Sequence, residues 1–92
     1  MIVLLHHNAD KYINRLNAKD RERIKEALRD LAKEPPKGDI RPYEGNPGIL
    51  RLKVGNYRII FKFTGTDSIL VSHVEPRGQA YTKRTRTERG KK

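Results

Sequence analysis

The pattern that decides the fold lies in residues 50–61, which read LRLKVGNYRIIF. Leucine or valine alternates with arginine or lysine as far as Val54, and this period of two is typical of a strand with one buried face. The pair Gly55-Asn56 is a two-residue hairpin signal. Alternation resumes at Tyr57 and continues through Phe63. The stretch therefore predicts two antiparallel strands joined by a tight turn.

A third strand is predicted directly after this hairpin. The turn sequence Gly65-Thr66-Asp67 leads into an apolar run from Ile69 to Val74, and Pro76 ends it. Because each connection is short, the three strands should form an antiparallel meander. At the other end of the chain, the β-rich run Ile2–Leu5 predicts a separate short strand.

Two antiparallel helices are expected between the first strand and Pro35-Pro36. Asn8 is the expected N-cap of the first helix and Asn17 that of the second. Both segments carry apolar residues at helical spacing. These stripes comprise Ala9, Tyr12, Ile13 and Leu16 in the first helix, and Ile24, Ala27, Leu28, Leu31 and Ala32 in the second.

The Pro- and Gly-rich residues 35–48 are expected to form a loop. The predicted fold class is therefore α+β, with a short N-terminal strand, two antiparallel helices and a three-stranded antiparallel meander. Residues 1–82 should form one domain. Residues 83–92 should form a flexible basic tail, because no apolar residue occurs after Tyr81.

Composition limits the class of protein. The chain has 92 residues, of which 35% are hydrophobic, so one small domain with a modest core is expected. It contains no cysteine, which excludes disulfides and thiolate zinc sites. The apolar run Ile2–Leu5 is too short for a signal peptide or a membrane span. A cytoplasmic protein with no membrane partner is therefore expected.

The net charge of +10 is unevenly distributed along the chain. Residues 1–40 carry nine Lys or Arg against seven Asp or Glu, whereas residues 41–92 carry twelve against four. Eight of the ten excess positive charges therefore lie in the second segment. A solvated surface usually mixes both signs. The imbalance favours contact with a polyanion, for which nucleic acid is the usual candidate.

The basic residues of the hairpin should gather on one surface. Arg51 and Lys53 share the strand face opposite the apolar residues, and the hairpin brings Arg58 near them. Arg77 follows the end of the last strand, and Tyr81 lies four residues further on. Arg58 and Arg77 are expected to face solvent. Exposed strand faces also carry basic residues for solubility and edge protection, so the pair at 51 and 53 alone indicates little.

RNA cleavage requires such a set of side chains. The ribose 2′-OH must be deprotonated, charge on the phosphorane stabilised and the 5′-oxygen protonated. Arginine suits the phosphate because its planar fork binds two oxygens, but it cannot act as a base. Lys53 is the candidate base, because neighbouring cations disfavour its ammonium form. Tyr81 could stack on a base or orient a reacting oxygen. No metal or other cofactor is required.

Residues 50–61 resemble the signature of the RelE/ParE toxin superfamily, in which a basic strand runs through Gly and a Tyr-Arg pair into an apolar strand. The resemblance covers nearly the whole chain. It matches Arg51 and Lys53 to the paired basic strand positions of the family, Arg58 to its phosphate-binding arginine, Arg77 to the arginine after the last strand, and Tyr81 to its C-terminal tyrosine. The first basic position is an arginine here, and the interval from Arg77 to Tyr81 is short beside some ribonuclease members.

The resemblance implies a toxin of a toxin–antitoxin pair, of the RelE type, which cleaves messenger RNA in the ribosomal A site. Its implied partners are the ribosome, mRNA and an antitoxin with an acidic or amphipathic segment. Further RNA contacts are expected from Lys62, Lys83, Arg84 and Arg86. Two alternatives stay open, a ParE-type toxin that inhibits gyrase and a non-catalytic RNA-binding module. His6, His7 and His73 are each expected to be structural.

Overall fold

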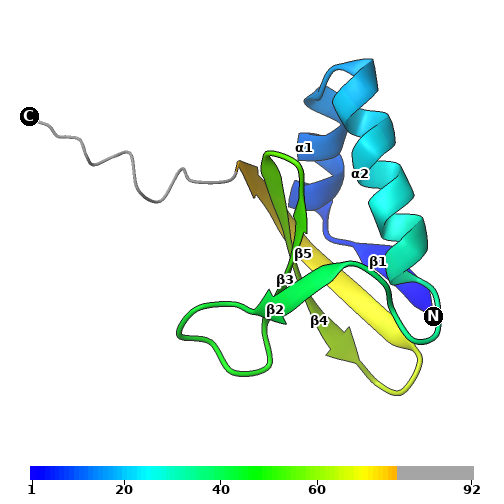
Figure 1. Cartoon of the computed structure of the whole chain (residues 1–92), viewed down its shortest axis with the longest axis vertical. Coiled ribbons are helices and arrows are strands. Elements are labelled where there is room, and N and C mark those ends of the chain that lie inside the picture. Colours follow the sequence, from blue (N-terminus) through cyan, green and yellow to red (C-terminus); the bar gives the residue numbers. More distant parts are fainter. Residues whose placement is uncertain (77–92) are drawn as a thin grey trace, which may run out of the picture.

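The computed structural model describes residues 1–76, which form two helices and a five-stranded sheet (Figure 1). The elements in chain order are β1 (Ile2–Leu5), α1 (His7–Arg15), α2 (Ala18–Leu31), β2 (Asp39–Pro42), β3 (Leu50–Val54), β4 (Tyr57–Thr64) and β5 (Ser68–Pro76). The predicted α+β class is confirmed. None of the helices in this part of the chain is long and apolar enough to span a membrane.

The sheet has the strand order β1-β5-β4-β3-β2. Strands β3, β4 and β5 form the predicted antiparallel meander, and Gly55-Asn56 makes the turn between β3 and β4. Gly55 has a φ of +57°, a conformation that glycine adopts at little cost. Strand β1 pairs in parallel with β5. The complete sheet is therefore mixed, whereas the sequence predicted β1 as a separate strand.

Strand β2 lies inside residues 35–48, so the prediction of an uninterrupted loop there was wrong. Ile40 pairs with Leu52 of β3, and this apolar pair fixes the register. The strand is only four residues long and lies at the edge of the sheet. Pro42 is tolerated at its end, because an edge strand can do without one backbone donor. The Pro- and Gly-rich composition of this segment predicts a loop and gives no indication of so short a strand.

The two helices cover one face of the sheet (Figure 1). The N-cap of α1 is His6, whose Nδ1 accepts a hydrogen bond of 3.0 Å from the backbone N–H of Asn8, so the prediction of Asn8 as the cap was wrong by two residues. Asn17 caps α2 as predicted, and its side-chain oxygen accepts from the backbone N–H of Asp20 at 2.9 Å. Helix α2 ends at Leu31, before the two prolines.

The core lies between the helices and the sheet. Its buried members are Ala9, Ile13, Ile24, Leu31, Leu52, Ile59, Phe61, Ile69, Val71 and Val74. Alternation along β4 sends Ile59 and Phe61 into this core, so Arg58, Ile60 and Lys62 lie on the opposite side of the sheet. That side, which faces away from the helices, is called the outer face below.

A β-bulge interrupts the pairing of β4 with β5. Ile60 lies opposite His73 but the next residue, Phe61, lies opposite Val71, so Ser72 is an extra residue in β5. An extra residue reverses the face to which later side chains of the strand point. Val71 and Val74 consequently both reach the core. His73, opposite Ile60, and Glu75, opposite Arg58, are therefore on the outer face.

Tyr57 connects the hairpin to α2. Its hydroxyl donates a 2.7 Å hydrogen bond to the carboxylate of Asp20, and its ring packs edge-to-face against Tyr12 with ring centroids 6.3 Å apart. The hydrogen bond to Asp20, together with burial, raises the pKa of Tyr57 above the ordinary value of 10.0. The folded protein therefore holds this proton more tightly than the unfolded chain.

We expect Tyr57→Phe to lower the free energy of unfolding by about 1 kcal/mol at neutral pH, because a half-exposed hydrogen bond to a carboxylate is lost. Since the folded pKa is raised, this contribution is full below about pH 10 and is lost as the pH rises through the folded value. Urea unfolding at neutral and alkaline pH would measure both effects. Tyr43→Phe is the matched control, because no side-chain hydrogen bond of Tyr43 is found within residues 1–76. Equal losses in the two variants would contradict the prediction.

Candidate functional site

The hairpin brings basic side chains together on the outer face. Lys53 of β3 lies directly opposite Arg58 of β4, and Arg51 lies opposite Ile60. Side chains that face each other across antiparallel strands have Cβ atoms about 4.5–5.5 Å apart. The structure thus gathers three of the predicted site residues, Arg51, Lys53 and Arg58, around one point of the sheet.

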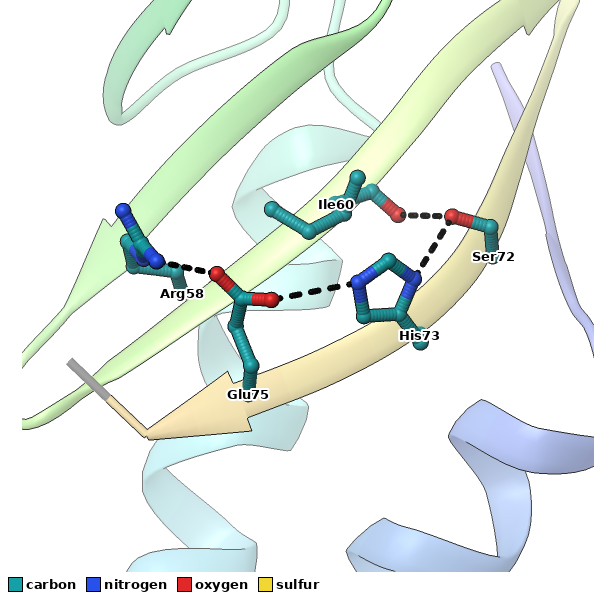
Figure 2. Close-up of polar contacts among 5 residues, drawn as sticks. All are labelled: Arg58, Ile60, Ser72, His73 and Glu75. Atoms are coloured by element: carbon teal, nitrogen blue, oxygen red, sulfur yellow. Dashed lines mark hydrogen bonds and ion pairs between the residues drawn. The ribbon is translucent and has the colours of Figure 1, made fainter. Parts of the chain in front are cut away.

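The side chain of Arg58 is held by a polar network (Figure 2). Its Nη2 forms an ion pair with Oε2 of Glu75, while Oε1 of the same carboxylate lies 3.2 Å from Nε2 of His73. His73 Nδ1 is 3.2 Å from Oγ of Ser72, and that hydroxyl donates to the backbone oxygen of Ile60 at 3.2 Å. The network links the bulge of β5 to the basic hairpin.

Arg58 is largely removed from solvent, with 20% of its side chain exposed, so the expectation that it faces water was wrong. Glu75 is 21% exposed. The Nε–H of Arg58 is buried and has no hydrogen-bond acceptor within residues 1–76. A guanidinium offers five N–H donors in a rigid fork. Part of this donor capacity is unused at a position where solvent screening is weak.

Arg51 and Lys53 differ in their surroundings. Nη1 of Arg51 lies 3.5 Å from the backbone oxygen and 3.9 Å from the carboxylate of Asp39, which precedes the hairpin on β2. Its side chain is 20% exposed. Lys53 is exposed and forms no ion pair within the described part of the chain. Of the three basic residues, Lys53 is therefore the one whose charged group is most accessible to a ligand.

Ile60 places a buried apolar side chain beside these charged residues. It is 2% exposed although it lies on the outer face, outside the core cluster. Lys62, the predicted RNA contact on β4, lies two residues beyond it and is exposed. Charges beside a buried apolar group interact with a ligand more strongly than charges in bulk water.

Two residues of this site were not predicted. The sequence assigned His73 a structural role and gave no reason to single out Glu75, yet both lie on the outer face in contact with the Arg58 network. Their positions depend on the bulge at Ser72, for which the sequence carried no signal. His6 instead caps α1. No group of three or more His, Cys, Asp or Glu side chains suited to a metal ion occurs among residues 1–76.

The remaining predicted site residues are Arg77, Tyr81, Lys83, Arg84 and Arg86. They lie outside the described residues, as does the predicted tail, 83–92. The last described residue, Pro76, lies opposite Tyr57, next to the pair formed by Arg58 and Glu75. The described chain therefore ends beside the basic site.

A protein-family model described as the ParE toxin of the type II toxin–antitoxin system parDE matches residues 3–81. The chain belongs to this family. It is thus a toxin of the RelE/ParE superfamily, as the resemblance implied, and the match covers every element of the fold. A search of curated proteins finds no matching sequence.

Solved structures of both named types share the fold of this toxin. The RelB-RelE antitoxin–toxin complex of Methanococcus jannaschii is 26% identical over 79% of this chain and 88% of that chain, with a TM-score of 0.65. The isolated E. coli RelE toxin is 20% identical over 89% and 92% of the two chains, with a TM-score of 0.67. The chromosomal ParDE system of P. aeruginosa is 20% identical over 84% and 96%, with a TM-score of 0.64. The RelE and ParE structures resemble this toxin equally well in fold.

Proposed function

We propose that this toxin is a metal-independent endoribonuclease that cleaves mRNA in the ribosomal A site and inhibits translation. The observation that supports this function best is the placement of Arg51, Lys53 and Arg58 around one point of the outer face. Three cations at this spacing match the charge that develops when a 2′-OH attacks the adjacent phosphate. The expected products are a 2′,3′-cyclic phosphate and a 5′-hydroxyl.

In the proposed mechanism, Arg58 holds the scissile phosphate. Its side chain is largely buried, so its charge is weakly screened and its orientation is fixed by the strand. Arg51 adds charge from the neighbouring strand, and the accessible amine of Lys53 accepts the 2′-OH proton. As the 2′-oxygen bonds to phosphorus, the bond from phosphorus to the 5′-oxygen breaks, and the 5′-oxygen takes a proton from water. By family resemblance, Arg77 adds a further phosphate contact and Tyr81 orients the substrate.

RNA on either side of the scissile bond would be held by the remaining basic residues. Lys62 extends the basic strip along β4, beyond Ile60. The predicted contacts in the C-terminal segment are Lys83, Arg84 and Arg86. Their role is electrostatic, so RNA binding should weaken as salt rises.

We further propose that an antitoxin with an acidic or amphipathic segment inhibits the toxin. The E. coli and M. jannaschii RelE chains were solved in complexes with RelB antitoxins. This toxin offers such a partner a basic outer face and an edge strand, β1, on which Ile2 is 56% and Leu4 is 49% exposed. Complementary charge would speed association, and burial of the apolar residues would add affinity. A partner encoded next to the toxin gene should abolish cleavage, and tight binding without inhibition would contradict this role.

The proposed reaction is tested with ribosomes programmed with mRNA. We expect the purified toxin to cut the mRNA at the A-site codon and to leave naked RNA largely intact. After brief treatment with EDTA under conditions that keep ribosomes assembled, cleavage should persist, because the proposed groups are cations and a tyrosine.

A parallel DNA supercoiling assay with gyrase tests the ParE-type alternative, to which the family model also gives weight. Inhibition of gyrase with intact mRNA would replace the nuclease by the gyrase-directed function. Binding of RNA without either activity would indicate an RNA-binding module.

A further inference from the structure

The carboxylate of Glu75 bridges two groups that could bind an anion. One oxygen pairs with Nη2 of Arg58, and the other lies 3.2 Å from Nε2 of His73. Figure 2 shows the carboxylate between the guanidinium and the imidazole, with the three side chains in one row on the outer face. Arginine binds carboxylates and phosphates through the same geometry, because both present two acceptor oxygens. The position of this carboxylate is thus one that a phosphodiester could occupy.

The hydrogen bonds of the network determine the form of His73. The backbone oxygen of Ile60 can only accept, so it takes the single hydroxyl proton of Ser72. Ser72 Oγ can then only accept from Nδ1 of His73. Glu75, ionised in its pair with Arg58, can likewise only accept from Nε2. Both ring nitrogens therefore lie within hydrogen-bond distance of an acceptor, an arrangement that suits the doubly protonated ring.

The charges around this ring come from four elements. On its own strand the ring contacts Glu75, whose charge, together with the larger effect of burial, also raises the pKa of Tyr12 on α1. The other charged residues of this part of the outer face are Arg58 and Lys62 on β4, Arg51 and Lys53 on β3, and Asp39 and Arg41 on β2, which lie opposite Lys53 and Arg51. Glu75 is therefore the one anion in contact with the ring among the described residues. An anion that replaced this carboxylate would meet two cations.

The donor geometry of Arg58 also indicates a missing acceptor. Its buried Nε–H has no partner within residues 1–76, while Nη2 is engaged by one oxygen of Glu75. Buried donors are normally satisfied, and an unsatisfied one calls for an explanation. A ligand that accepted hydrogen bonds from both Nε and Nη2 of Arg58 would supply the missing acceptor.

We propose that Glu75 occupies the phosphate position of the free toxin, and that an RNA phosphate which displaces it is held between Arg58 and the His73 imidazolium. This inference rests on the proposed function only in that it takes the ligand to be RNA. No bond is made or broken in the exchange, in which one anion leaves the two cations and another takes its place. Glu75 is an internal competitor, and His73 is a further phosphate-binding residue.

Two effects on RNA affinity follow. Loss of the Glu75 charge should strengthen RNA binding, because the competing anion is removed while an amide still offers His73 an acceptor. Binding should also weaken as the pH rises, because an imidazole without its extra proton no longer supplies the second positive charge. That decrease should disappear when His73 is replaced by asparagine.

The probe is a short oligonucleotide with 2′-O-methyl riboses, which cannot be cleaved by 2′-OH attack and keeps the same phosphodiester charge as the pH rises. Fluorescence anisotropy with the full-length toxin measures its dissociation constant. We expect Glu75→Gln to bind about threefold more tightly or better than the wild type, the effect of a partly exposed ion pair. The matched control is Glu26→Gln, which makes the same charge change on an exposed position of α2, on the other side of the sheet.

For the pH dependence, His73→Asn is compared with His7→Asn, which removes an exposed histidine from α1. Melting temperatures establish that each variant is folded, and Glu75→Ala repeats the charge removal with a smaller side chain. The proposal is overturned if both Glu75 variants bind no more tightly than Glu26→Gln, or if the pH dependence survives in His73→Asn. The assay contains no ribosome and measures no cleavage. Absence of mRNA cleavage alongside the expected binding shifts would therefore overturn the enzymatic function and leave this phosphate site standing.

Discussion

Replacing Arg58 by alanine is expected to slow single-turnover mRNA cleavage by on the order of 100-fold or more, as the loss of a charged transition-state donor does. The guanidinium is largely buried, fixed on β4 and directly opposite Lys53. Once RNA has displaced Glu75, its charge would therefore act on the phosphorane with little screening. By family resemblance, the same loss is expected for Arg77→Ala.

The partner of Arg58 requires a control, because Arg58→Ala leaves the half-buried carboxylate of Glu75 without its cation. An unpaired buried charge lowers stability, and a poorly folded variant would also be inactive. The double variant Arg58→Ala/Glu75→Gln removes both charges and should regain stability in urea unfolding without regaining activity. Arg29→Ala, an equal loss of charge on the exposed side of α2, should cleave at the wild-type rate. Near-normal cleavage by the Arg58 variants would show that the phosphate site lies elsewhere.

The hairpin was predictable because its signals are local. The alternation up to Val54, the turn at Gly55 and the alternation after it each depend on residues close in sequence. They fix which residues of β3 and β4 share a face, and so bring Arg58 opposite Lys53. The N-cap at Asn17 was predictable for the same reason, because the bond that it makes spans three residues.

The second half of the site was not predictable, because it depends on a single extra residue. Without the bulge, strict alternation from Ile69 and Val71 would point His73 toward the core, which agrees with the structural role that the sequence suggested. Ser72 shifts the register and brings His73 to the outer face beside Arg58. Bulges are set by pairing with the neighbouring strand, which the sequence of β5 alone does not reveal.

The pairing of β1 with β5 and the presence of β2 were also not predicted, because each depends on contact with another strand. The pairing of β1 with β5 joins residues more than sixty positions apart, such as Ile2 and Ser68, with both helices between them in the sequence. Strand β2 exists through its pairing with β3, in which Ile40 lies opposite Leu52. Local composition favours a loop at residues 35–48, and pairing with β3 overrides it.

Replacing Lys53 by arginine is expected to remove most of the cleavage activity, on the order of 100-fold, although the charge is kept, because arginine cannot accept the 2′-OH proton. Lys53 lies opposite Arg58 and two residues from Arg51, and its amine is exposed to an incoming ribose. The proton transfer requires the neutral amine of Lys53, which lies between Arg58 on β4 and Asp39 on β2.

Single-turnover rates measured against pH distinguish a base from a charge at this position. If Lys53 is the base, the wild-type rate should rise with pH on the limb where the amine loses its proton, and that limb should vanish in Lys53→Arg. Lys25→Arg is the matched control, because Lys25 is an exposed lysine of α2 that is assigned neither RNA binding nor proton transfer. It should keep both the rate and the profile. A nearly normal rate with an unchanged profile in Lys53→Arg would leave Lys53 as an electrostatic contact to the phosphate, and the base would then have to be sought among the residues that follow Pro76.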